Sequence, residues 1–157
     1  MSMTDEAFEA IVRQLQDQAF ADARRAYGEK GFERWRNPRF NGPLEGSDAD
    51  ASGGVKGGCG DTINIYLKFN GGRVEAASYT TDGCGSSALC GSFTAELAHG
   101  RNVEELLELT PEDVLNTIGT FPEQETHCAT LAISALQEAV NNYMIRVVAQ
   151  NRKTEPC

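Results

Sequence analysis

The sequence predicts a chain of the α/β class, in which helices pack against an antiparallel hairpin. Apolar and polar residues alternate over 63–80, as they do in strands with one buried face. Apolar residues recur every three or four positions over 4–27 and again from about 127 to 147, as they do in amphipathic helices. With 157 residues and 40% apolar composition, the chain is long enough to form one domain with its own core.

The first predicted element is the amphipathic helix over 4–27, for which Thr4 is a suitable N-cap. Its apolar positions are Phe8, Ile11, Val12, Leu15, Ala19 and Phe20. Glycine, proline and polar residues then dominate from Asn37 to Gly60. Because such a composition builds turns and contributes little to a core, we expect a mobile loop that leads into Cys59.

The hairpin consists of two runs joined by Asn70-Gly71-Gly72, a sequence typical of tight turns. A helix is expected over 86–99, directly after Cys84, and Gly100 is its natural C-cap. Asn102 with Glu105 resembles a capping box, and Thr110-Pro111 is a typical helix start, so two short helices should follow.

The long C-terminal helix should begin near His127 and pack on the sheet. Residues 151–157 are polar and are expected to form a flexible tail. We therefore divide the chain into an N-terminal helical extension (1–25), one main domain (26–150) and the tail.

Charge and hydropathy exclude several classes of partner. The formal charge of -9 opposes the phosphate contacts that drive nucleic-acid binding. The sequence has no apolar run of about 18 residues that could span a membrane. Its start also lacks the basic and apolar segments of a signal peptide, so we expect a cytoplasmic protein without nucleic-acid or membrane partners.

Three cysteines lie in glycine-flanked or helix-opening positions: Cys59-Gly60-Asp61, Gly83-Cys84-Gly85 and His127-Cys128. They are separated by 25 and 44 residues, and none belongs to the C-x-x-C pairs that hold a local structural zinc. We predict one metal site that only the folded chain can assemble, with Cys59, Asp61, Cys84, His127 and Cys128 as candidate ligands.

The residue types suit a labile metal site. A helix N-terminus favours the thiolate form of a cysteine, which is the form that binds metal and attacks sulfur. The carboxylate of Asp61 binds iron or zinc more weakly than a thiolate does, which would leave one position exchangeable. His127 can ligate or act as an acid-base group beside Cys128, and these two neighbours are alternatives more than joint ligands of one ion.

These residues match the motifs of a known family. The chain resembles the scaffold proteins of iron-sulfur cluster assembly, IscU and the N-terminal domain of NifU, over roughly 26–146. The matching segments are Ala26-Tyr27, 37–42, Gly58-Cys59-Gly60-Asp61, 83–88, 100–107 and His127-Cys128, in the family's order and spacing.

The resemblance implies an α/β (α+β) fold with a small antiparallel sheet packed against several helices. It implies a scaffold and not an enzyme, which builds a transient 2Fe-2S cluster at Cys59, Cys84 and Cys128 with Asp61 or His127 nearby. It also implies a cysteine desulfurase partner that delivers persulfide sulfur to Cys128, with Cys59 and Cys84 as further candidates, and apo-proteins or carriers that receive the cluster.

The alternative within the family is a zinc-containing sulfur acceptor of the SufU type, which stimulates a desulfurase without holding a cluster. That branch carries an insertion between the second and third cysteines and lacks the histidine, so His127 and the short interval favour the scaffold.

Two departures from the family leave partners open. Phe121-Pro122-Glu123-Gln124-Glu125 stands where the family has a Leu-Pro-Pro-Val-Lys chaperone-recognition segment. The use of a dedicated chaperone is therefore undecided. The first 25 residues extend beyond the common start, and a role in core packing, partner binding or a homodimer is equally open.

The remaining cysteines and the second histidine have simpler interpretations. Cys90 lies six residues after Cys84 and suits core packing, and Cys157 suits an exposed terminus. His99, at a helix end, is a favourable charge for the helix dipole. A purely structural zinc or interaction domain is the weakest of the functional hypotheses.

Overall fold

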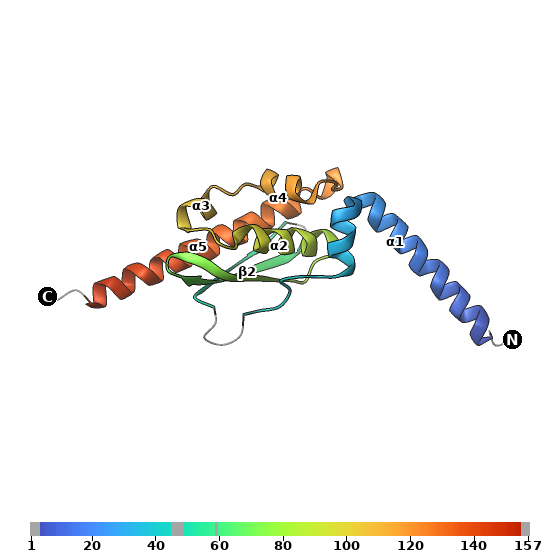
Figure 1. Ribbon diagram of the computed structural model, residues 1–157, viewed down its shortest axis with the longest axis horizontal. Coiled ribbons are helices and arrows are strands. Elements are labelled where there is room, and N and C mark those ends of the chain that lie inside the picture. The colour runs from blue at the N-terminus through green and yellow to red at the C-terminus, as the bar shows by residue number, and fades with distance from the viewer. Residues whose placement is uncertain (1–3, 45–48, 59, 155–157) are drawn as a thin grey trace.

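The computed structural model describes residues 4–44, 49–58 and 60–154 (Figure 1). The elements follow in the order α1 (Asp5–Arg36), β1 (Ala51–Lys56), β2 (Thr62–Asn70), β3 (Arg73–Thr81), α2 (Gly85–Ala98), α3 (Val103–Leu107), α4 (Pro111–Ile118), the 3-10 helix η2 (Glu123–Glu125) and α5 (His127–Thr154). The predicted α/β class is confirmed: the described strands form one antiparallel sheet in the order β1-β2-β3, with helices packed on it.

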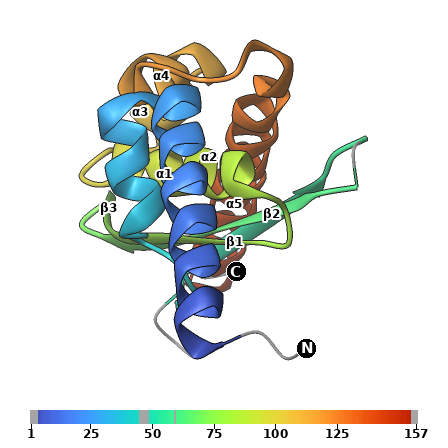
Figure 2. The same cartoon turned by 90° about the vertical axis from the view of Figure 1, so that its right-hand side faces the viewer.

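The predicted hairpin is formed by β2 and β3, with a register irregularity between Lys68 and Phe69. The alternation in β2 has the expected consequence, since Ile63, Ile65 and Leu67 are fully buried while the residues between them are partly exposed. These side chains pack beneath α2 and α5, which lie together over the sheet in Figures 1 and 2. The core is therefore a layer between the sheet and these two helices.

The loop predicted over 37–60 is wrong in two places. Residues 51–56 form β1, which pairs antiparallel with β2, and Asn41 bridges to Tyr79 of β3. Gly53 explains why composition misled: a Cβ there would lie 2.3 Å from the backbone nitrogen of Ala139 in α5. The glycine lets a strand approach a helix backbone closely, so here it builds the core and does not interrupt it.

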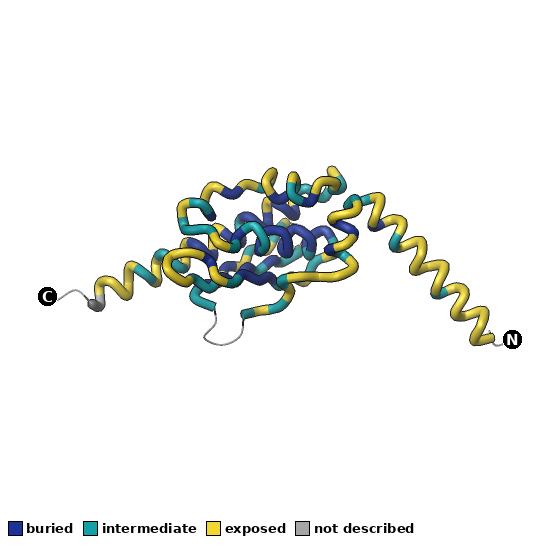
Figure 3. Tube along the Cα trace, viewed as in Figure 1, coloured by how far each residue is buried: buried dark blue, intermediate teal, exposed yellow. Residues whose placement is uncertain are grey.

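The first helix is longer than predicted and is kinked. Thr4 caps it as expected, accepting a hydrogen bond from the Ala7 amide at 3.2 Å, but α1 continues to Arg36. Gly28 has φ 71° inside the helix, one residue after the predicted end at 27, and a Cβ there would meet Thr120 at 3.0 Å. Figure 3 shows the consequence: the segment before the kink projects from the body and is exposed, while the segment after it packs on the body.

The packed part of α1 is attached by Arg34, whose side chain is only 5% exposed. Its guanidinium donates to Ser92 Oγ at 2.9 Å and to Glu96 Oε1 at 2.6 Å, and it lies 4.1 Å from the ring centre of Phe93. All three partners belong to α2. The end of α1 is thereby held on the helix that begins at Cys84.

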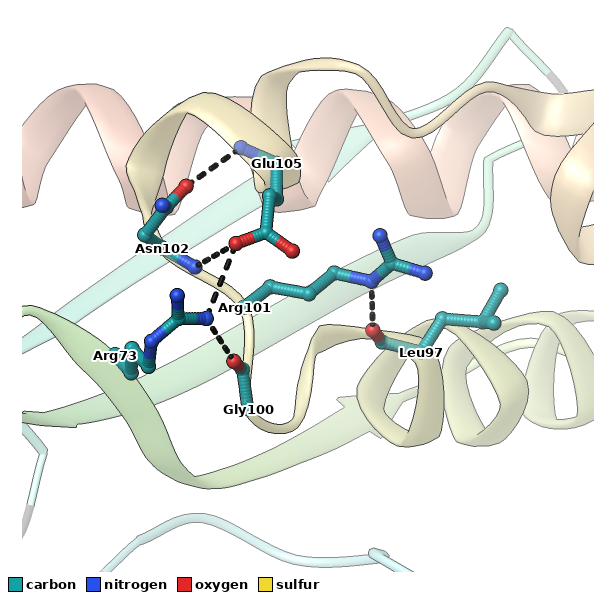
Figure 4. A network of polar contacts seen from close by, with 6 residues as sticks. All are labelled: Arg73, Leu97, Gly100, Arg101, Asn102 and Glu105. Carbon is teal, nitrogen blue, oxygen red and sulfur yellow. Dashed lines mark hydrogen bonds and ion pairs between the residues drawn. The ribbon is translucent and has the colours of Figure 1, made fainter.

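The predicted short helices are confirmed, both with capping boxes, at Asn102 and Glu105 for α3 and at Thr110 and Asp113 for α4. Figure 4 shows how the first of these is joined to the sheet: Arg73 at the start of β3 donates to the Gly100 carbonyl at 2.8 Å and to Glu105 at 3.1 Å. This network sets the turn between α2 and α3, far from the three cysteine segments.

The last helix, α5, begins at His127 as predicted and continues to Thr154, so the first four residues of the expected tail are helical. Its N-terminal half is buried along the sheet, and its last turns project from the body at the end opposite α1 (Figure 1). Within the described parts of the chain, no helix is both long and apolar enough to cross a membrane.

Candidate metal centre

Three remote segments meet at the N-terminal ends of α2 and α5. Ser87, in the first turn of α2, donates a hydrogen bond to Asp61 Oδ2 at 3.1 Å. The same hydroxyl lies 3.5 Å from the sulfur of Cys128, in the first turn of α5. Because Ser87 is fully buried, this chain of contacts is a fixed part of the fold that joins the start of β2 to both helices.

Cys84 is the N-cap of α2, as the sequence predicted, and its side chain is exposed. Among the described residues it makes no side-chain capping hydrogen bond. Gly83 beside it is required by space, since a Cβ there would lie 2.7 Å from both Asp61 Oδ2 and Ser87 Oγ. The carboxylate of Asp61 is therefore packed against the residue that precedes Cys84.

Cys128 is only 2% exposed, whereas His127 beside it is exposed. The Nε2 atom of His127 lies 3.8 Å from the sulfur of Cys128, so the imidazole and the thiol can form a hydrogen bond in which either group is the donor. This supports an acid-base or shielding role for His127. The burial of Cys128 means that an incoming reagent reaches this sulfur only if the start of α5 moves.

A second chain of hydrogen bonds runs alongside the first. Ser86 donates to Glu125 Oε2 and is 2.9 Å from the hydroxyl of Tyr27 in α1. Burial raises the pKa of Tyr27, the hydrogen bond with Ser86 lowers it, and the charges of Glu125, Cys84 and Cys128 raise it again, with a net rise. Tyr27 therefore stays neutral and can donate a proton in this network at physiological pH.

Cys90 is fully buried in the core, as predicted. Burial raises the pKa of its thiol strongly, and the charges of Cys128, Cys84 and Glu125 raise it further. A thiol held in its protonated form is a poor metal ligand and a poor nucleophile. Cys90 is therefore a packing residue next to the cysteine segments.

Position 59 lies outside the described residues, so the predicted role of Cys59 stays a prediction. The residues on either side form a tight turn: the Gly57 amide donates to the Asp61 carbonyl at 2.8 Å, and the Gly60 amide donates to the Gly57 carbonyl at 3.0 Å. Gly60 has φ 95°, a conformation that favours glycine. In the sequence, position 59 is two residues before Asp61, whose carboxylate contacts Ser87.

The candidate ligand side chains among the described residues fit an exchangeable metal site better than a preformed site with all ligands in place. Over residues 4–44, 49–58 and 60–154, no three histidine, cysteine, aspartate or glutamate side chains lie close enough together to hold a metal ion. Two thiols, one carboxylate and one imidazole nevertheless lie at one end of the fold, where two helix N-termini meet. Thiolate ligands select iron and zinc, and the helix ends favour anionic sulfur.

Sequence reasoning identified Asp61, Cys84, His127 and Cys128 but missed the residues that connect them. Ser86, Ser87 and Tyr27 lie inside the segments that carry the family resemblance, and Glu125 directly precedes Thr126-His127. Their contacts join residues that are 26, 39 and 59 positions apart in the sequence. Motif position was the only available signal, since no local pattern predicts such pairs.

Most of the chain is similar to known proteins. The model of the NifU-like N-terminal domain matches residues 26–150. The iron-sulfur cluster assembly scaffold protein IscU 1 of Archaeoglobus fulgidus is 37% identical over 118 residues, which are 74% of this chain and 76% of that protein. The scaffold protein IscU of Azotobacter vinelandii is 33% identical over 75% of this chain and 94% of its own length.

Solved structures share the fold at low sequence identity. A NifU-like protein (N-terminal) from Brucella abortus superposes with a TM-score of 0.59 at 20% identity, over 78% of this chain and 96% of that one. A SUF-system scaffold from Fervidobacterium islandicum gives a TM-score of 0.56 at 18% identity, over 75% and 98%. Both show similarity of fold.

Proposed function

The chain belongs to the NifU-like N-terminal domain family, and from this premise we propose that it is a scaffold on which iron-sulfur clusters are assembled and from which they pass to apo-proteins. Relatives at 31–37% identity over about three quarters of the chain are named iron-sulfur cluster assembly scaffolds. The single observation that carries the proposal is the buried contact of Ser87 with both Asp61 and Cys128, since it brings two candidate ligands from remote segments to the cap of α2 at Cys84.

We assign the cluster to Cys59, Cys84 and Cys128, with Asp61 as the exchangeable ligand and His127 as its alternative. The cluster is cargo, so its ligands must release it. A carboxylate hydrogen-bonded to Ser87 can change partner between the hydroxyl and iron, whereas a fourth thiolate would bind iron more tightly. A 2Fe-2S cluster needs four ligand positions, which three cysteines and one carboxylate or imidazole fill.

Sulfur enters, in this proposal, as the outer sulfur of a persulfide on a cysteine desulfurase. The thiolate of Cys128 attacks that sulfur, the bond between the two donor sulfurs breaks, and the donor cysteine leaves as a thiolate. Each sulfur then needs two electrons from an external reductant to become sulfide. Because Cys128 is 2% exposed, docking of the desulfurase must open the start of α5, and Cys84 is the exposed alternative acceptor.

Anaerobic reconstitution tests the proposal. The protein is incubated with ferrous iron, cysteine, a reductant and a cysteine desulfurase, and visible absorption, iron and acid-labile sulfide are measured. We expect about two irons and two sulfides per cluster. A colourless product that holds only zinc would support the sulfur-acceptor alternative, which a rise in desulfurase turnover on adding zinc-loaded protein would then establish.

Serine variants distinguish the proposed ligand cysteines from a cysteine that only packs in the core. Cys84→Ser and Cys128→Ser should lose the cluster yet keep a cooperative thermal transition, because Cys84 is exposed and the buried Cys128 changes by a single atom of similar size. Cys90→Ser is the matched control: it changes the same atom and should retain the cluster at some cost in stability. Unfolding of Cys128→Ser alone would instead indicate a structural zinc domain.

A further inference from the structure

The first half of α1 presents an apolar stripe that nothing in the described chain covers. Phe8, Ile11 and Leu15 are 60%, 44% and 62% exposed. Between Thr4 and Ala19 only Val12 is even partly buried. These four residues recur at the spacing of one helix face, so the stripe is built as a packing surface. It ends at Phe20, which packs edge-on against Phe32 and Trp35 after the kink.

The last turns of α5 carry a matching feature. Met144, Ile145, Val148, Ala149 and Arg152 line a groove of about 320 Å³. Ile145 and Val148 are 60% and 50% exposed. This groove is separate from the cysteine segments, because α5 carries His127 and Cys128 at its other end.

The two surfaces have opposite charge. At 100° per residue, Asp5 and Glu9 lie on the side of the helix next to the stripe, whereas Glu6, Arg13 and Asp17 lie on the opposite side. The groove contains Arg152, and the helix from 141 to 152 has no acidic residue. Arg146 lies outside the groove and donates to the Asp50 carbonyl. Contact between two stripes would bring like charges together, and so would contact between two grooves, whereas stripe on groove pairs opposite charges.

One molecule cannot make this contact with itself. Figure 1 places the projecting part of α1 and the projecting part of α5 at opposite ends of the body. The complementary surface therefore belongs to another molecule, and an identical chain carries an exposed apolar surface of opposite charge.

We propose that this protein self-associates by laying the α1 stripe of one copy into the α5 groove of a second copy. Two such contacts related by a twofold axis close a dimer in which both ends of each chain are covered. Since stable complexes bury about 1,200–2,000 Å², the doubled contact of a closed dimer is favoured over a single one. The cysteine segments remain open in this arrangement.

A complementation experiment tests the proposal on the full-length chain. Leu15→Asp disables the stripe and Val148→Asp disables the groove; both positions are exposed, so folding should be unaffected by circular dichroism. By sedimentation velocity, the wild type should associate and each variant alone should be monomeric at the same concentration. An equal mixture of the two should associate again but more weakly than the wild type. The mixed dimer has one intact contact, between the α1 of Val148→Asp and the groove of Leu15→Asp, and one contact that carries both aspartates.

Two further variants test whether the loss of association is specific to the stripe and the groove. Gln14→Asp adds the same charge one position before Leu15, on a side of the helix turned about 100° from that residue. It should associate like the wild type. Arg152→Glu should weaken association at least about tenfold by reversing the charge in the groove. A wild type that stays monomeric at high concentration overturns the proposal. So does either variant that associates alone like the wild type, since that result indicates stripe-to-stripe or groove-to-groove pairing. A mixture that associates no more strongly than the separate variants overturns it as well.

Discussion

At the scale of single residues, Ser87 connects the candidate ligands. Its one hydroxyl proton is given to Asp61, so its oxygen can accept a hydrogen bond from the thiol of Cys128. When the thiol ionises, the same proton can turn to the thiolate. Ser87 thus links the hydrogen bonding of the Asp61 carboxylate to the ionisation of the Cys128 thiol, without being a ligand itself.

Asp61→Ala should lengthen the lifetime of a reconstituted cluster several-fold, because it removes the weak ligand through which the cluster is released or attacked. The decay of visible absorption in the presence of a chelator measures this lifetime. Ser87→Ala is the control: it removes the hydroxyl contacts with Asp61 and Cys128 but keeps the weakly ligating carboxylate, and should not lengthen the lifetime. A cluster in Asp61→Ala that decays as fast as in the wild type would refute the assignment.

The thiols of Cys84 and Cys90 should differ sharply in reactivity. Burial raises the pKa of Cys90, so its reactive thiolate is scarce at neutral pH and stays scarce up to about pH 9, while Cys84 is exposed. Iodoacetamide labelling followed by peptide mass spectrometry should find Cys84 modified at least about tenfold faster. The contrast should disappear in urea, and equal rates in the native protein would contradict the burial of Cys90.

At the scale of elements, close packing of β1 on α5 depends on glycine. Gly53→Ala would place a Cβ against the backbone of Ala139 and Ala135, which cannot yield as a flexible side chain does. We expect a loss of about 1–3 kcal/mol in the free energy of unfolding, measured by chemical denaturation. Gly58→Ala meets nothing within 4 Å and should change stability by less than about 1 kcal/mol.

The attachment of α1 to α2 depends on a buried ion pair. Arg34→Ala would leave Glu96 without its cation and Ser92 without its donor, and should cost about 3–5 kcal/mol. Glu96 is 34% exposed, so the lower end of that range is expected. The exposed pair of Arg25 with Asp22 is the control, and Arg25→Ala should change stability by less than about 1 kcal/mol.

At the scale of the whole molecule, the helical extension and the main domain differ in how much of their side-chain surface is buried. The proposed boundary between residues 25 and 26 falls inside α1, but the residues before Phe20 bury almost nothing. Deleting 2–19 should therefore leave the thermal unfolding temperature within a few degrees of the full chain. Deleting 2–36 removes Phe32 and Arg34 from the core and should abolish cooperative unfolding. A large loss on the shorter deletion would show that the extension is part of the core.

Local chemistry determined most of the elements. The alternation over 63–80 predicted β2 and β3 because one face of a strand is buried, and the capping residues Thr4, Asn102 and Thr110 set helix starts through their own side chains. Proline and glycine marked the same boundaries. These signals act within a few residues, and a sequence displays them directly.

What the sequence could not determine are the effects of residues that meet only after folding. Gly53 was interpreted as a loop residue because its reason for being small is the backbone of α5. The helix predicted over 4–27 was too short because it continues beyond a kink at Gly28 to a part that packs on α2. The candidate ligands were identifiable by type and family spacing. Their connection through Ser87 depends on how β2, α2 and α5 pack, which is decided by the shared core between the sheet and the helices and by no local preference.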